Sequence, residues 1–226
     1  NRNIVAAGGN LWRYTSQTAS VLAQGLNSSN FWFFTQIQDP RSASDDVVIG
    51  TNGNDPVKIW NGVESSAANL SAVTSSTGVM PAKFITSMKN RVYLLNVIDA
   101  TDVDAKSKVL VSGFSNQGAP RPQIFDNNFY VGGSDDEGEI TGNAILHDQL
   151  IIFKRNATYK FAPGSGRIID TAQLVKMNDE IGCVAPGSVA VAGNFVVFLA
   201  ELGVYAFDGN NFQYLSKDVE PEFENT

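Results

Sequence analysis

Acidic side chains are the most concentrated source of chemistry in this sequence, and the run Ser134–Glu139 places four carboxylates within six residues. Clustered carboxylates beside a glycine can coordinate Ca²⁺ through oxygen. The alternating Asp/Asn ligands and the distal Glu of a calcium-binding loop are absent, however, so a hydrated surface loop is the favoured interpretation. A similar interpretation applies to Ile98–Lys106, where Asp99, Asp102 and Asp104 predict a protruding polar hairpin.

The chain has one histidine and one cysteine, and this limits its nucleophilic and metal chemistry. A catalytic triad with a histidine would have to use His147 beside Asp148, yet no serine occupies a Gly-x-Ser-x-Gly turn. We therefore expect His147 to be a structural histidine at a strand end. Cys183 cannot form an internal disulfide or a Cys-based metal cage, and we expect a buried thiol. The sequence thus predicts no catalytic residue, no metal site and no cofactor.

The elements that position these side chains are expected to be β-strands. The clearest pattern in the chain is a series of short strands between residues 181 and 216. Period-two alternation, short apolar runs and Gly-centred turns are typical of antiparallel hairpins. Four strands are expected there: Ser188–Val191, Phe195–Leu199, Val204–Phe207 and Phe212–Leu215. One such sheet cannot bury both of its faces alone, so copies of it are expected elsewhere.

Copies of the third of these strands recur along the chain. The matching segments are Leu11–Tyr14, Val57–Gly62, Thr158–Phe161, Val204–Gly209 and, less closely, Pro122–Asp126. The step from Tyr14 to Trp60 equals the step from Phe161 to Phe207, and both are close to the roughly 40–45 residues of a four-stranded propeller blade. Phe125 is out of step, so the middle of the chain must carry an insertion.

A second marker, a polar pair before an apolar run, supports the same repeat. It occurs at Asn90-Arg91, Asp148-Gln149 and Gly193-Asn194. In this frame Trp60, Phe125, Phe161 and Phe207 are expected at equivalent, mostly buried positions between the sheets, because large aromatic side chains fill the layer between packed sheets.

The fold class predicted from these repeats is all-β, a β-propeller of about five four-stranded blades in which the first blade lacks its opening strand. We expect residues 1–226 to be a single domain, and Asn1 in place of Met suggests a segment of a longer product. The residues 113–122 are expected to form a long loop. The strands expected in the first four blades are Ile4–Ala7, Leu11–Thr15 and Ala19–Leu22; Phe31–Ile37, Val47–Gly50 and Val57–Trp60, with a fourth within Ser65–Ala72; Lys83–Met88, Val92–Val97, Lys108–Ser112 and Phe129–Val131; and Ala144–Leu146, Leu150–Lys154, Thr158–Ala162 and Ile168–Val175.

The predicted fold argues against an enzyme. Glycosidase propellers need two or three carboxylates facing the central axis. The strands expected to line the axis contain neither Asp nor Glu; they are Phe31–Ile37, Lys83–Met88, Ala144–Leu146 and Ser188–Val191. Lys154, Arg155 and Lys160 form a small basic group that we interpret as a solvated rim.

Composition excludes further classes of function. The formal net charge of −7 makes the chain a poor ligand for polyanions, so sequence-specific nucleic-acid binding is not expected. No apolar run approaches the roughly 20 residues needed to cross a bilayer, so no membrane role is expected. The abundance of Gly, Ser and Asn is typical of turn-rich β structure.

The order of several motifs resembles that of the β-propeller proteins of tailed-phage tails. The resemblance spans roughly Val92–Val219 and rests on Lys108–Ser112, Pro122–Asp126, Tyr130–Gly133, Asp135–Gly138, Ile140–Gly142, Leu150–Arg155, Ile181–Pro186 and Gly203–Gly209. These proteins include nozzle, tail-tube and packaged-DNA-stabilising components of short-tailed phages. The resemblance implies a non-enzymatic virion protein, commonly a homo-oligomeric ring in contact with other tail proteins, and it supplies no catalytic residue.

An alternative function stays open, a propeller that binds a glycan or receptor during host recognition. Propeller loops can present aromatic side chains to sugars, and Trp12, Trp32, Trp60 and Tyr130 are available. Their places in alternating strands favour the interpretation that they belong to the core.

The incomplete first blade generates a prediction about residues 218–226. An unpaired strand edge is an aggregation hazard, and either this tail or sequence outside the segment must pair with Ile4–Ala7. We expect the outside sequence to do so, because Pro221 cannot donate a hydrogen bond to a long central strand. Deletion of residues 218–226 should then leave the solubility and the melting temperature unchanged in thermal unfolding. Precipitation of the truncated chain, or a clearly lower melting temperature, would identify the tail as the closing strand.

Overall fold

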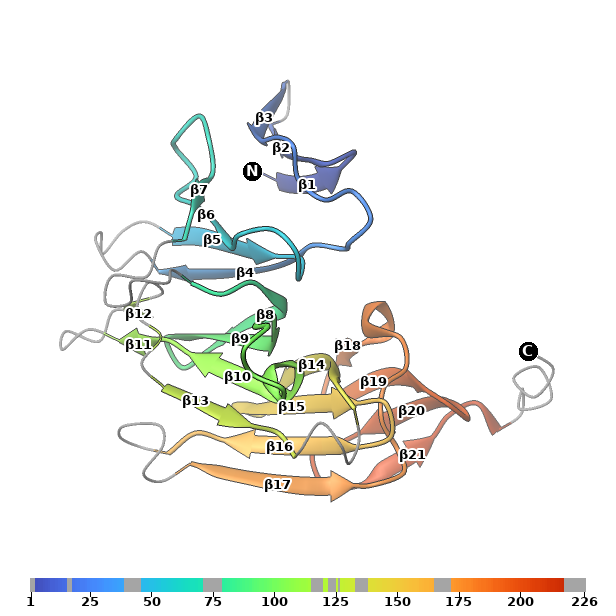
Figure 1. Ribbon diagram of the computed structural model, residues 1–226. Helices are drawn as coiled ribbons and strands as arrows, with labels where there is room; N and C mark the ends of the chain where they lie inside the picture. The colour runs from blue at the N-terminus through green and yellow to red at the C-terminus, as the bar shows by residue number, and fades with distance from the viewer. Residues whose placement is uncertain are drawn as a thin grey trace. The chain divides into compact units, whose positions relative to one another are not determined.

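A computed structural model describes residues 3–15, 18–38, 46–70, 79–114, 120–121, 125, 127–132, 138–164 and 172–217 (Figure 1). The ordered elements within these ranges are short β-strands and two 3₁₀ helices, η1 (Ala105–Ser107) and η2 (Pro186–Ser188). No helix in this part of the chain is long and apolar enough to cross a membrane. The acidic run at 134–137 and the tail at 218–226 lie outside the described residues, so the expectations for both stay predictions.

The strands form a succession of antiparallel sheets, which we number in chain order. The first sheet has three strands, β1 (Asn3–Ala7), β2 (Asn10–Tyr14) and β3 (Ala19–Ala23). The second has β4 (Phe33–Gln38), β5 (Asp46–Thr51), β6 (Lys58–Trp60) and β7 (Ala68–Asn69). The third has the order β13-β10-β9-β8, with β8 (Ala82–Met88), β9 (Arg91–Val97), β10 (Lys108–Val111) and β13 (Asn127–Tyr130).

The last two sheets repeat the same four-stranded order. The fourth has β14 (Ile140–Leu146), β15 (Gln149–Lys154), β16 (Thr158–Ala162) and β17 (Gln173–Asn178). The fifth has β18 (Ala190–Ala192), β19 (Phe195–Ala200), β20 (Gly203–Phe207) and β21 (Phe212–Tyr214). This repetition confirms the predicted all-β, propeller-like fold of about five blades, with a first sheet that is one strand short.

Two expected connections are different in the structure. Residues 98–106 form turns followed by η1, and no strands pair there, because Asp99 accepts the backbone N–H of Thr101 at 2.9 Å and Asp102 accepts that of Asp104 at 3.0 Å. Each carboxylate therefore closes a local turn. The second expectation, a loop over residues 113–122, is also wrong in part, since β11 (Gly113–Phe114) pairs with β12 (Pro120–Arg121).

In two sheets the hairpin turn begins one residue before the polar pair, Asn90-Arg91 or Asp148-Gln149, that marked it in the sequence. The two-residue turns are Lys89-Asn90 between β8 and β9, and His147-Asp148 between β14 and β15. All four residues have positive φ, between 48° and 59°, which is what the favoured two-residue hairpin turn requires. His147 therefore lies in an exposed turn directly after a strand, and not within a strand end.

The third strands carry a repeated aromatic position. Trp60, Phe161 and Phe207 are buried and pair with the aliphatic residues Val48, Leu150 and Val196 of the preceding strands. Phe125 does not share this position. In the third sheet the third strand is β10, and there Val111 pairs with Tyr93. Phe125 belongs to no strand and is only partly buried. The residues inserted between β10 and β13 explain why it is out of step.

Two pairs of successive sheets, the second with the third and the fourth with the fifth, are joined at the end of the second strand of the earlier sheet. In the segment that connects the fourth sheet to the fifth, the Cys183 N–H donates to the carbonyl of Lys154 at 2.9 Å. A Cβ on Gly182 would collide with the carbonyl oxygens of Lys154 and Arg155, so only glycine fits this crossing. Between the second and third sheets, Thr51 Oγ1 donates to the carbonyl of Ala82 at 2.5 Å.

The first and second sheets use the same device. Leu26 N–H donates to the carbonyl of Gly9 at 2.9 Å, in the turn after β1. A Cβ on Gly9 would lie 2.8 Å from the carbonyl oxygen of Leu26, and Gly9 has a φ of 73°. Glycine thus permits both the turn and the close approach of the connecting chain. Ala67 N–H adds a bond to the carbonyl of Leu22 at 2.8 Å.

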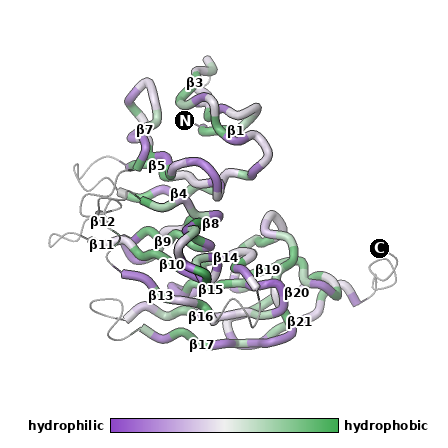
Figure 2. The backbone as a smooth tube through the Cα atoms, viewed as in Figure 1, coloured by the Kyte–Doolittle hydropathy of each residue, from purple (hydrophilic) through white to green (hydrophobic). Residues whose placement is uncertain are grey.

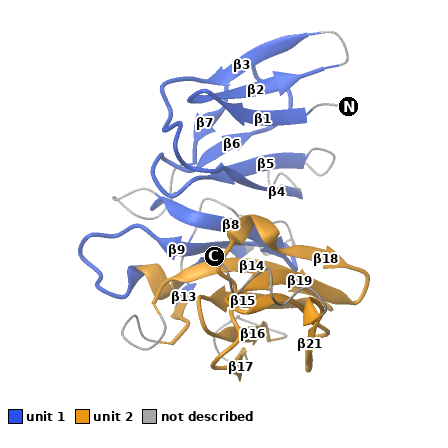
Figure 3. Ribbon diagram, turned by 90° about the vertical axis from the view of Figure 1, so that its right-hand side faces the viewer, with its two compact units in different colours: residues 1–105, 109–128 blue, residues 106–108, 129–226 orange. Residues whose placement is uncertain are grey.

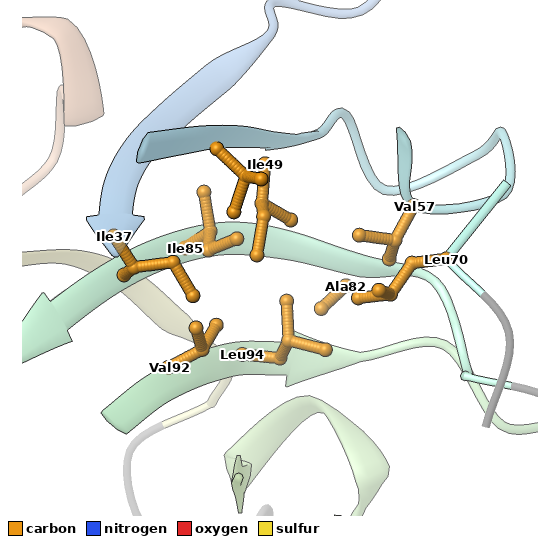
Figure 4. Close-up of a cluster of buried hydrophobic side chains, with 9 residues drawn as sticks. Ile37, Ile49, Val57, Leu70, Ala82, Ile85, Val92 and Leu94 are labelled. Carbon is orange, nitrogen blue, oxygen red and sulfur yellow. The ribbon is translucent and has the colours of Figure 1, made fainter. Parts of the chain in front are cut away.

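The chain divides into two compact units, residues 1–105 with 109–128 and residues 106–108 with 129–226 (Figure 3). Figure 2 shows hydrophobic stretches along the strands of both units. In the first unit, buried aliphatic side chains of β4, β5, β8 and β9 point toward one another; Figure 4 labels Ile37, Ile49, Val57, Leu70, Ala82, Ile85, Val92 and Leu94. In the second unit, Phe153, Phe198 and Phe207 belong to one buried cluster. The expectation of a single domain stays a prediction.

Burial of the repeated aromatic position predicts a large loss of stability for Phe207→Ala. Phe207 is 0% exposed and stacks on Phe212 with ring centroids 4.4 Å apart, so truncation should cost about 3–5 kcal/mol of unfolding free energy. Tyr14 at the end of β2 fits the same repeat but is 43% exposed, and Tyr14→Ala should cost less than about 1 kcal/mol. Denaturant unfolding of both variants measures the two losses. A loss below about 1 kcal/mol for Phe207→Ala would show that Phe207 is not a core residue.

Candidate functional site

An open cleft of about 380 Å³ lies in the first unit, at the end of β4, the start of β5 and the turn between β8 and β9. It is lined by Gln36, Ile37, Asp46, Ser87, Met88, Lys89 and Asn90. Its apolar lining comes from Ile37 and Met88, both of which are buried. The sheets hold the lining residues in place because Ile37 belongs to the aliphatic cluster that packs β4 against β8 (Figure 4).

Hydrogen bonds fix the polar wall of this cleft. Gln36 Nε2 donates to Asp46 Oδ2 at 2.6 Å, and this bond joins two exposed side chains of adjacent strands. Thr35 Oγ1 donates to Ser87 Oγ at 2.8 Å, and Ser87 Oγ in turn donates to the carbonyl of Gln36 at 3.2 Å. These bonds connect the second sheet to the third at the cleft, so its shape depends on both sheets.

Three polar groups of the cleft keep hydrogen-bonding capacity. Among the described residues, none bonds to the Oε1 atom of Gln36, to the Oδ1 atom of Asp46 or to the ammonium group of Lys89. Gln36 and Asp46 supply acceptors and Lys89 supplies donors. Among the described lining residues, Asp46 is anionic and Lys89 is cationic, so these two charges are opposite.

The cleft does not have the composition of a known catalytic site. Asp46 is its one carboxylate, so the two-carboxylate arrangement of a glycosidase is not formed by these lining residues. Over the described ranges, no three His, Cys, Asp or Glu side chains come close enough together to hold a metal ion. The described lining residues thus offer hydrogen-bonding groups for a polar ligand, and they contain neither a carboxylate pair nor a metal-binding cluster.

Neither His147 nor Cys183 is among the described lining residues of this cleft. His147 is exposed in its turn, and its Nδ1 atom lies near Gly209. Cys183 is fully buried, as expected, and its thiol donates to the carbonyl of Ala185 at 3.2 Å. Burial raises the pKa of the Cys183 thiol, so the reactive thiolate is disfavoured. Tyr93 is also fully buried, and burial raises its pKa to about 12.

The basic group expected on a solvated rim is divided in the structure. Arg155 is exposed and forms an ion pair with Glu201, in which Nη2 donates to both carboxylate oxygens at 2.8 and 3.1 Å. Lys160 donates to the carbonyl of Gly209 at 2.8 Å and so connects the fourth and fifth sheets. Lys154 is 0% exposed, which corrects the expectation, because β15 is the buried second strand of its sheet.

The aromatic candidates are mostly part of the packing. Trp60 is buried, with its Nε1 donating to the carbonyl of Glu64 at 2.8 Å. Trp12 and Trp32 are half-buried, and Trp32 stacks on Phe34 with ring centroids 5.9 Å apart. Tyr130 is 42% exposed, and the ammonium group of Lys108 lies 5.3 Å from its ring centroid. These four residues do not gather in the cleft.

Sequence reasoning missed the cleft altogether. Its walls come from residues about 50 positions apart in the chain, such as Gln36 and Ser87, and none belongs to a recognisable motif. The available signal was weak: polar residues at the end of one expected strand and in the turn after another. Only the packing of β4 against β8 brings them together.

Comparison with known proteins supports the fold. No protein-family model and no curated protein matches the sequence. The structure is similar to that of a candidate 6-phosphogluconolactonase from Bacteroides uniformis, with a TM-score of 0.51 and 12% identity over 91% of this chain and 62% of that chain. It is also similar to BBS1N, solved in complex with ARL6DN, with a TM-score of 0.51 and 14% identity over 93% and 62% of the two chains.

These similarities concern the fold alone. The chain spans 62% of the length of each of the two proteins, and the identities are too low to transfer an activity. What is shown is a propeller-like all-β architecture, in agreement with the repeated four-stranded sheets.

The burial of Cys183 generates a prediction about thiol chemistry. At pH 8, the raised pKa and the lack of access should make the native thiol react with a disulfide reagent such as dithionitrobenzoate at least about 100-fold more slowly than the unfolded chain. The absorbance of the released product measures the rate, and the urea-unfolded chain, which should release one equivalent, is the control. Release of one equivalent from the native protein at the unfolded rate would contradict the buried position.

Proposed function

We propose that this chain is a non-enzymatic structural module of the tail of a short-tailed phage, of the nozzle or tail-tube type. In this role it contributes to tail assembly and to the retention or passage of DNA. Its partners are other tail proteins and further copies of itself in a ring, and its location is the virion. The proposal extends the propeller-like fold with the resemblance found in the sequence.

One observation carries the proposal: the motifs of the resemblance occupy positions that close turns within a sheet or join one sheet to the next. Gly182 and Cys183 form the crossing over the end of β15. Gly203 has a φ of 135°, and a Cβ there would collide with the Ser216 hydroxyl, which accepts the N–H of Val204 at 2.8 Å. Asp208 accepts the backbone N–H groups of Asn211 and Asn210 at 2.7 and 2.8 Å, and these bonds lower its pKa. Motifs with such roles suit a scaffold.

The strands nearest the expected axis also support a non-enzymatic role. The first strands of the second to fifth sheets are β4, β8, β14 and β18, and none contains Asp or Glu. A net charge of −7 repels DNA, which suits a protein that lets DNA pass without retaining it by charge. The likeness to a candidate lactonase does not oppose this role, because it rests on fold similarity at 12% identity.

The alternative, a propeller that binds a glycan or receptor, has lost part of its original basis. Three of the four aromatic residues that suggested it are buried or half-buried. A different observation now favours a binding function, namely the polar cleft of the first unit.

Immunogold labelling of purified virions tests the tail role. An antibody raised against this chain should place gold on the tails in negative-stain images, because a tail module is present in many copies at one site. Antibody that has been absorbed with the purified chain is the control and should leave the tails unlabelled. Gold confined to capsids, or virions without gold, would contradict the proposal.

A further inference from the structure

We propose that the cleft at Gln36, Asp46 and Lys89 is a binding site for a neutral saccharide. This inference goes beyond the tail role and does not depend on it, because the cleft can bind a saccharide whether or not the protein is part of a tail. It rests on the cleft itself, which is formed by the second and third sheets of the first unit.

The shape of the cleft sets the size of the ligand. A volume of about 380 Å³ lies within the roughly 300–1,000 Å³ range of small-molecule sites. Its walls are held by hydrogen bonds from Gln36 to Asp46 and between Thr35 and Ser87, so little ordering of these side chains is needed when a ligand binds. A ligand of one or two sugar rings suits this size.

The chemistry of the cleft selects hydroxyl groups. The Oδ1 atom of Asp46 and the Oε1 atom of Gln36 accept hydrogen bonds, and the ammonium group of Lys89 donates them. A sugar hydroxyl both donates and accepts, so neighbouring hydroxyls of one ring can bond to the acid–amide pair and to the lysine together. The hydrogen bond between Gln36 Nε2 and Asp46 Oδ2, at 2.6 Å, orients the amide so that its oxygen stays available.

The same groups disfavour other ligands. A ligand with a single charge is attracted by one of the side chains Asp46 and Lys89 and repelled by the other, so the pair does not select either sign. A divalent metal ion would find one carboxylate among the lining residues, beside an ammonium group. An apolar ligand would gain little, because Ile37 and Met88 are buried and present small areas. The described lining residues therefore favour a neutral polyhydroxylated ligand.

Saturation-transfer NMR with the whole chain tests the site. The probes are glucose, galactose, mannose, N-acetylglucosamine, lactose and cellobiose. We expect at least one of them to bind saturably with a dissociation constant on the order of 1 mM, because an open cleft offers few charge-assisted hydrogen bonds. Asp46→Ala and Lys89→Ala should each weaken that binding by about tenfold or more, since each removes one charged partner.

Matched controls separate the cleft from the rest of the surface. Asp179→Ala and Lys217→Ala remove the same charges at exposed positions outside the cleft and should leave the affinity unchanged. Thermal unfolding verifies that all four variants are folded, and their exposed positions make large losses of stability unexpected. Absence of saturable binding of every probe up to about 50 mM, or unchanged binding in the Asp46→Ala and Lys89→Ala variants, would overturn the proposal.

Discussion

The structure depends on the way each sheet is joined to the next. A sheet of three or four short strands has two faces and can bury them only against its neighbours. The arriving chain bonds to the hydroxyl of Thr51 or the carbonyl of Lys154, each at the end of a second strand, or to the carbonyl of Gly9 in the turn after β1. Since these atoms are backbone or buried, the joint allows no larger side chain at Gly182 and little movement of the connecting segment.

Some polar side chains add bonds between successive sheets. Lys160 bonds to the carbonyl of Gly209 across two sheets, and Arg155 pairs with Glu201. Among the described lining residues of the cleft, Gln36, Asp46 and Lys89 keep hydrogen-bonding capacity. The binding site that we propose uses these three side chains.

Much of the fold could be predicted because alternation and turn residues act locally. The strands around Val196 and Phe207 follow from period-two patterns, and their copies follow from equal spacing. The turn His147-Asp148 could not be placed as well, because it has no glycine to mark its positive φ. Phe125 was misplaced since an aromatic residue in an inserted segment imitates the repeat. The cleft could not be predicted from the sequence, because Gln36 and Ser87 come together only through the packing of two sheets.

Amide hydrogen exchange of the native chain tests the central claim most directly. The account predicts that the Leu26 and Cys183 amides, although both lie outside strands, exchange as slowly as amides paired inside the neighbouring sheets, because each donates to a backbone carbonyl of the preceding sheet, Gly9 or Lys154. The amide of Gly187, which lies in η2 after the crossing, should exchange quickly by comparison. If the Leu26 and Cys183 amides exchanged as fast as that of Gly187, the joints would not hold the sheets together and the account would be wrong.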